Sequence, residues 1–134
     1  MKILDATLRD GGFVNDFNWD IEFARKYYDL MSKFKIHYIE LGYWKQTKKS
    51  KNPFYNMGIN EVDKITKNAV SENACIIIDY HYCTKDLKSY PIKNQTPISM
   101  IRITSRKEDI DKAIIFANKL RDKTELDISL QVIN

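Results

Sequence analysis

The 134-residue sequence has few of the residues and segments that mark several protein classes. Its two cysteines, Cys75 and Cys83, are too few for the disulfide framework of a small secreted domain. No apolar run approaches the roughly 18 to 20 residues that a membrane span needs, and the first residues lack the apolar core of a signal peptide. The four glycines form no glycine-rich phosphate loop. These absences predict a reducing, cytoplasmic setting and no membrane partner.

The sequence also has no large excess of positive or negative residues. The 22 lysines and arginines against 18 acidic residues give a net charge of +4, spread along the chain, which predicts no nucleic-acid partner. The one dense basic run, residues 45–51, is by default a solvated loop, although it could attract an anionic substrate. With 43% hydrophobic and 30% charged residues, the chain should bury one core. Residues 1–134 are therefore expected to form one domain, or a piece of one.

The hydrophobic pattern predicts strands that alternate with helices. Strands are expected over residues 3–9, 38–44, 74–78, 98–104 and 126–133, and helices over 20–31, from about 58–60 to 70, and 110–120. The fourteen or so residues before the fourth strand contain Pro91 and Pro97, so at most one helical turn fits there. Alternating strands and helices imply βαβ units and a parallel sheet.

Each predicted strand has one polar face. These faces carry Asp5, Thr7 and Arg9; Tyr38, Glu40 and Gly42; Asp79 and His81; Arg102 and Thr104; and Ser129 and Gln131. If the apolar faces lie under the helices, the polar faces line a common interior toward the carboxyl ends of the strands, where parallel α/β proteins place their sites. Interior charges need partners, so an ion pair between Arg9 and Glu40 is expected. A purely structural ion-pair network and a binding site both fit this pattern.

Two weaker candidates lie after the third predicted strand. Asp79, His81 and Cys83 could in principle bind a metal, but alternate positions of one strand fan apart, which favours ordinary pocket lining. His81 is the better single candidate, as a substrate contact or proton carrier at the pocket mouth. A lone histidine is more often structural.

Residues 4–12, Leu-Asp-Ala-Thr-Leu-Arg-Asp-Gly-Gly, resemble the first strand of the HMG-CoA lyase-like metallolyases, a superfamily that includes 4-hydroxy-2-oxovalerate aldolase and the pyruvate carboxylase carboxyltransferase domain. Residues 39–43, 101–103 and 130–132 resemble later strands of the same family. The resemblance implies a TIM-type (β/α)₈ barrel in which Mn²⁺ or Mg²⁺ holds an α-keto acid or acyl substrate while a carbon–carbon bond forms or breaks through an enolate. It also implies that Arg9 stabilises the enolate oxygen, that Asp10 is a metal ligand, and that Glu40 positions Arg9 or a water.

The sequence departs from the family pattern in two respects. The family's His-x-His metal ligands are missing, because His37 and His81 are the only histidines, and Phe13 stands where the aldolases have a histidine. The predicted strands also make only about half of a barrel that typically needs about 250 residues. The chain should therefore bind metal weakly or not at all, and should associate with the remainder of a barrel or with a second copy. The alternative function is a non-catalytic half-barrel that binds a partner chain or a small acid.

Overall fold

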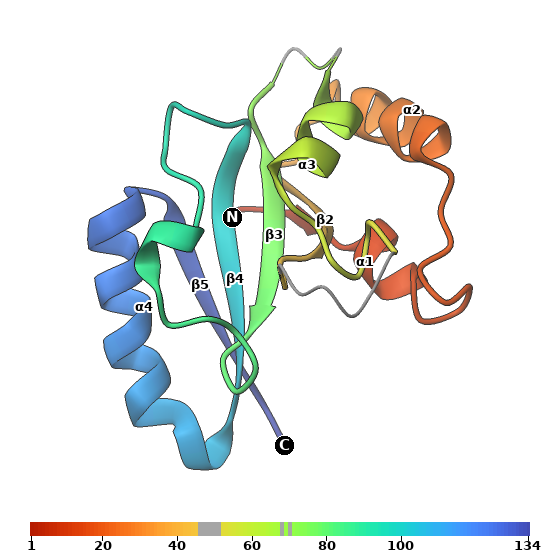
Figure 1. Ribbon diagram of the computed structural model, residues 1–134. Helices are drawn as coiled ribbons and strands as arrows, with labels where there is room; N and C mark the ends of the chain where they lie inside the picture. Colours follow the sequence, from red (N-terminus) through yellow and green to blue (C-terminus); the bar gives the residue numbers. More distant parts are fainter. Residues whose placement is uncertain (46–51, 68, 70) are drawn as a thin grey trace.

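The computed structural model describes residues 1–45, 52–67, 69 and 71–134. Within them, five parallel strands form one sheet in the order of the sequence (Figure 1). The strands are β1 (Leu4–Asp5), β2 (Tyr38–Tyr43), β3 (Ala74–Asp79), β4 (Ile98–Arg106) and β5 (Asp127–Ile133). The sheet curls into half of an α/β barrel. The alternating pattern predicted the parallel sheet, and the resemblance implied the barrel.

The helices connect successive strands and cover the outer face of the curled sheet (Figure 1). They are α1 (Thr7–Gly11), α2 (Ile21–Ser32), α3 (Ile59–Thr66) and α4 (Ile110–Thr124), with single 3₁₀ turns η1 (Leu87–Ser89) and η2 (Lys107–Asp109). Asp20 caps α2, because its carboxylate accepts a hydrogen bond from the Glu22 amide. Among the described residues, no helix is both long and apolar enough to cross a membrane.

The prediction of a first strand over residues 3–9 is wrong beyond Asp5. The Asp5 carboxylate accepts a hydrogen bond from the Thr7 amide at 2.8 Å, which turns the chain, and the Asp10 amide then bonds to the Ala6 carbonyl at 2.7 Å. Such local bonds of an aspartate compete with strand pairing. Arg9 consequently belongs to α1, which directly follows β1, and not to a strand.

The connection from β3 to β4 has no crossover helix. Its one regular element in the described chain is η1, which agrees with the expectation of at most a single helical turn. The other described crossovers between strands contain α2, α3 and α4. The outer face of the sheet is therefore less thickly covered beside η1 than elsewhere.

The main core lies between the outer face of the sheet and the helices. Alternate residues of the three central strands point into it, including Ile39, Leu41, Ile76, Ile78, Ile101 and Ile103. The helices contribute Tyr28, Val62, Ile65, Phe116 and Leu120. Burial of this apolar surface is the main stabilising contribution to the fold.

The inner, concave face has a smaller apolar cluster at its amino-terminal end, formed by Tyr38, Cys75 and Met100 with Leu4 packed against it. Polar contacts tie the two edges of the sheet together here. The Tyr38 hydroxyl donates to the Asp127 carboxylate, and the Lys2 ammonium lies 3.2 Å from the same carboxylate. This end of the inner face is thus filled, and the charged residues lie farther along the strands.

Candidate functional site

The centre of the inner face is a buried carboxylate held between two guanidinium groups. Glu40 on β2 is fully buried, and its Oε1 lies 2.5 Å from Arg9 Nε and 2.9 Å from Arg102 Nη2. Its Oε2 lies 2.8 Å from Arg102 Nε. The side chains of Arg9 and Arg102 are 11% and 14% exposed. We call Arg9, Glu40 and Arg102 the charged triad.

Three separate elements bring the triad together. Glu40 faces inward because its neighbours Ile39 and Leu41 enter the outer core, and Arg102 faces inward for the same reason between Ile101 and Ile103. Arg9 reaches the same point from α1, above the end of β1. The predicted pair of Arg9 with Glu40 is therefore present, although the strand phasing that suggested it was wrong for Arg9.

Arg102 was not among the site residues predicted from the sequence. A signal for it was present, because an arginine between two isoleucines of a strand must point away from the apolar face. Sequence alone left open which interior acid it would meet. In the sheet, Glu40 is level with Cys75 and Met100, and Arg102 stands two residues farther along β4 than Met100. The long side chain of Arg102 spans this offset to reach Glu40.

Burial and charge act in opposite directions on Glu40. Burial raises the pKa of its carboxyl above the ordinary value, and the lowering by Arg9 and Arg102 does not fully offset this. The pKa of Arg9 is also raised: burial lowers it, but the hydrogen bond and charge of Glu40 more than compensate. Burial likewise raises the pKa of the Cys75 thiol well above its usual value, so this thiol remains protonated.

Asp10 does not lie in a ready-made metal site. Its carboxylate is 63% exposed and forms an ion pair with Arg9 Nη1. Among the described residues, no three His, Cys, Asp or Glu side chains are grouped closely enough to hold a metal ion. A divalent cation needs several oxygen or nitrogen donors, and Asp10 supplies one carboxylate that Arg9 already engages. The described residues of this chain therefore do not fit the implied metal.

Aromatic rings border the triad on the side of α1. Phe13, in the place of the aldolase histidine, packs with the rings of Phe17 and Tyr43 at centroid distances of 5.1 and 6.4 Å. Burial raises the pKa of the Tyr43 hydroxyl, while the neighbouring Arg9 lowers it less strongly. Tyr43 was not predicted as a site residue, because an aromatic at a strand end has the same pattern as a core residue.

His81, which was also predicted as a site residue, makes no contact with Arg9, Glu40 or Arg102 among the described contacts of the triad. β3 ends at Asp79, and His81 lies in the turn that follows. The His81 amide donates a hydrogen bond to the Asp79 carboxylate at 2.9 Å. The prediction that Asp79, His81 and Cys83 share one strand face is therefore wrong. The His81 ring is 54% exposed, and its Nδ1 lies 3.4 Å from the Asp109 carboxylate.

The basic run can be placed only at its first residue. Lys45 Nζ lies 3.4 Å from the centre of the Tyr55 ring and 5.0 Å from that of Tyr43, so it extends the aromatic border with a positive charge. Lys48, Lys49 and Lys51 lie outside the described residues. Their expected role as a solvated or anion-attracting loop stays a prediction.

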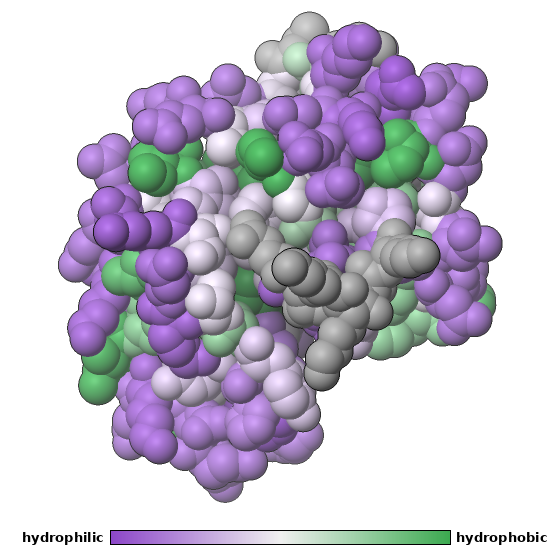
Figure 2. All heavy atoms as spheres, in the orientation of Figure 1, coloured by the Kyte–Doolittle hydropathy of each residue, from purple (hydrophilic) through white to green (hydrophobic). Residues whose placement is uncertain are grey.

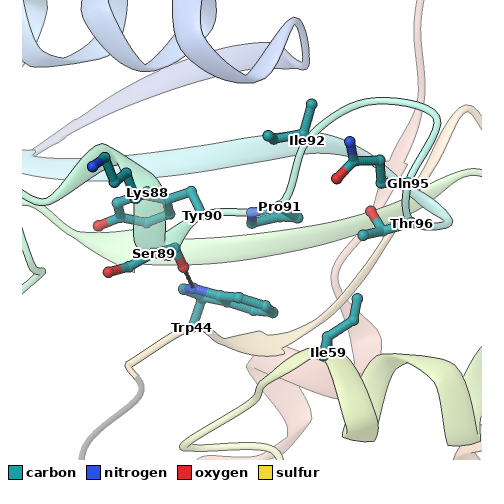
Figure 3. A pocket seen from close by; sticks show the side chains of 9 residues that line it. All are labelled: Trp44, Ile59, Lys88, Ser89, Tyr90, Pro91, Ile92, Gln95 and Thr96. Atoms are coloured by element: carbon teal, nitrogen blue, oxygen red, sulfur yellow. Dashed lines mark hydrogen bonds between the residues drawn. The ribbon is translucent and has the colours of Figure 1, made fainter.

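A well-formed hollow elsewhere shares no residue with the triad. It has a volume of about 400 Å³ and lies between Trp44, Ile59 at the start of α3 and residues 88–96 (Figure 3). Its wall is fixed by the Trp44 indole, which donates to the Ser89 carbonyl at 3.2 Å. This hollow is on the helix-covered side of the sheet, opposite the charged triad.

Comparison with known proteins gives one informative likeness. No protein-family model and no curated protein matches the sequence. A crystal structure of the N-terminal domain of a "putative aldolase" from Bacteroides vulgatus is similar to the whole of this chain, with a TM-score of 0.73 and 23% sequence identity. The match covers 100% of this chain and 45% of that one, so this chain spans less than half the length of its neighbour. At this identity the likeness establishes the fold, a half-barrel.

Proposed function

We propose that the chain is the N-terminal half of an aldolase-type carbon–carbon lyase that binds a small α-keto acid through Arg9 and Arg102. The observation that carries the proposal is the charged triad on the inner face. Two guanidiniums surround one buried carboxylate, and the other partner of Arg9 is the exposed carboxylate of Asp10, which a substrate oxyanion can replace. A guanidinium favours oxyanions, and it can bind two oxygens at once.

The residue types suit the chemistry of a retro-aldol reaction. When the C3–C4 bond of a 4-hydroxy-2-keto acid breaks, its electron pair becomes an enolate whose charge rests on the C2 oxygen. Arg9 is proposed to bind that oxygen, while Arg102 binds the carboxylate and Glu40 holds both arginines in place. Fixed cations at the position of developing charge are a large source of rate acceleration.

The proton of the C4 hydroxyl must leave for another group. Phe13 occupies the place where the aldolases have a histidine, and it cannot accept a proton. We propose that the acceptor, and the donors of any Mn²⁺ or Mg²⁺, come from the remainder of the barrel or from a second copy of the chain. β5 is an edge strand of the sheet that the described residues form, and either could add its strand there. In the 134-residue chain alone, we expect Mn²⁺ binding to be weak.

The experiment has two stages. Oxalate, which imitates the pyruvate enolate, is titrated into the ¹⁵N-labelled chain while the Nε–H signals of Arg9 and Arg102 are followed by NMR. Pyruvate release from 4-hydroxy-2-keto acids with Mn²⁺ is then measured on this chain, and on a longer chain if the reading frame continues past Asn134. Arg9→Lys should abolish turnover, because lysine retains the charge without the planar guanidinium. Arg25→Lys is the matched control, since Arg25 is a partly buried arginine of α2 that pairs with Glu22 and has no contact with the triad.

A second candidate function is a non-catalytic module that binds a small acid or a partner chain. The engagement of Asp10 by Arg9 and the aromatic packing of Phe13 favour it. The two functions differ in the second stage only. Oxalate binding at the two arginines without turnover in any form of the chain would support a module that binds a small acid. Absence of oxalate binding would contradict both the lyase and that acid-binding module.

A further inference from the structure

A cavity of about 420 Å³ lies on the outer side of the molecule, between α4 and the β3–β4 connection. Four residues of α4 line it: Lys112, Ile115, Phe116 and Lys119. They stand at positions i, i+3, i+4 and i+7 and so form one stripe along the helix. Tyr80, Lys85 and Leu87 line the opposite wall. The cavity is on the other face of the sheet from the charged triad, and its residues have no part in the proposed lyase.

The cavity follows from the missing crossover helix. In the βα units around it, a helix of 8 to 15 residues covers the sheet, whereas this connection has only the three residues of η1. The stripe of α4 therefore faces the β3–β4 connection and not a full helix, and Ile115 is 57% exposed. Phe116 is 7% exposed and forms the floor, with its ring 5.8 Å from that of Tyr80. Figure 2 shows hydrophobic surface on the α4 side, surrounded by hydrophilic side chains.

The charges around this apolar floor are all of one sign. The described lining residues include three lysines and no acidic side chain. Lys85 is held in place, because its ammonium donates to the Tyr80 carbonyl and lies 4.0 Å from the centre of the Tyr80 ring. Lys112 and Lys119 form no ion pair with any residue that the structure describes, so both ammonium groups are available to a ligand.

We propose that this lysine-rimmed cavity binds a small amphipathic carboxylate, with an aryl or branched alkyl body on Phe116 and Ile115. The carboxylate is bound by Lys112 or Lys119, at the two ends of the stripe. The volume lies within the 300 to 1,000 Å³ that is typical of small-molecule sites, and an apolar floor with a few charged groups is the usual composition of such sites. The alternative is that the cavity binds no ligand and that its lysines are simply solvated beside an exposed Ile115.

The test uses three probes that share an aromatic body: 4-phenylbutyrate, the neutral 4-phenylbutan-1-ol and the cationic 4-phenylbutylamine. Each is titrated into the ¹⁵N-labelled 134-residue chain, and the shifted backbone amides are mapped by NMR. We expect saturable shifts confined to α4 and to residues 80–90 for the carboxylate, weaker ones for the alcohol and none for the amine. Equal shifts for all three probes, or shifts scattered over the molecule, would overturn the proposal.

Charge variants separate the site from general attraction to a basic protein. The double variant Lys112→Gln/Lys119→Gln removes whichever lysine binds the carboxylate, and should raise the dissociation constant of 4-phenylbutyrate by roughly two- to fivefold, as expected for the loss of one exposed charge contact. Lys26→Gln/Lys123→Gln removes the same charge from exposed positions outside the cavity and should leave the constant unchanged. An equal effect of both double variants would contradict a site at this cavity. All four substitutions are on exposed helix surfaces and should leave the fold intact, which the NMR spectra verify.

Discussion

The two faces of the sheet are held by different interactions: apolar burial on the outer face and ion pairs on the inner face. The outer face is apolar, and its side chains are buried under helices without any directional requirement. The inner face carries the charged triad, in which each group depends on a specific partner at a specific distance. The difference teaches that the outer face is stabilised by burial alone, whereas each charged group of the inner face needs its partner, an arrangement that suits the binding site proposed above.

The strongest way to break this comparison is to remove the shared carboxylate. Glu40→Ala strands both Arg9 and Arg102 in a poorly solvated interior, and loss of one partner from a buried pair costs about 3 to 5 kcal/mol. We expect a fall of that order in the free energy of unfolding, measured by urea denaturation. Glu22→Ala, which removes the exposed partner of Arg25, should cost under about 1 kcal/mol. Equal midpoints for the two variants would mean that the triad is solvated.

The next largest loss of stability is expected where the backbone of β2 contacts the backbone of Phe54. A Cβ at Gly42 would lie 2.3 Å from the Phe54 carbonyl oxygen, which is backbone and cannot move aside easily. Residues 52–57 are pinned there, since the Tyr43 amide donates to that same carbonyl at 2.9 Å. Gly42→Ala should therefore destabilise the fold by about 1 to 3 kcal/mol, as overpacking does. A thermal melt indistinguishable from that of the parent would contradict this close approach.

A conservative change on the outer face should have less effect. Ile78 is 1% exposed and belongs to the main core, so Ile78→Val removes one methylene from a well-packed place. The expected cost is roughly 0.5 to 1.5 kcal/mol in urea denaturation. A loss as large as that of Glu40→Ala would remove the contrast between the two faces.

The pH dependence of stability tests the environment of Glu40 on the inner face while the side chain is still present. Because burial raises the pKa of Glu40, the folded protein binds this proton more tightly than the unfolded chain does. The associated stability is present below the ordinary pKa of 4.5 and is lost as the pH rises through the higher pKa of the folded state. The parent should therefore lose more stability than Glu40→Gln between pH 4.5 and neutral pH. Parallel pH curves for the two proteins would contradict the raised pKa.

Much of the fold could be predicted from the sequence because the outer face is governed by periodicity. The apolar patterns of β2 and β4, the nearly continuous apolar run of β3 and the helical spacing of α4 located these elements closely. Pro91 and Pro97 correctly excluded a third crossover helix. The first strand was predicted too long, because the alternation continues through Arg9 while a side-chain bond from Asp5 to the Thr7 amide ends the strand.

The candidate site was less predictable, because its geometry depends on register and on turns. Arg9 and Glu40 were predicted to pair, and they do. Arg102 was missed as their third member, since it is two residues farther along β4 than Met100, the residue level with Glu40, and only the path of its side chain brings it to the carboxylate. His81 was expected beside the site mouth on a strand face, but the turn after Asp79 directs it toward Asp109. Roles for Asp10 and His81 in a complete barrel stay predictions.

The central claim is that the charged triad serves binding and not stability, and the variant Arg9→Met/Glu40→Leu/Arg102→Met tests it most directly. Replacing a whole buried ion network by apolar side chains of similar size is often neutral or stabilising, in contrast to removal of one member. The account predicts a free energy of unfolding equal to or above that of the parent in urea denaturation. A loss of about 3 kcal/mol or more, comparable with Glu40→Ala, would contradict it and make the triad a structural brace.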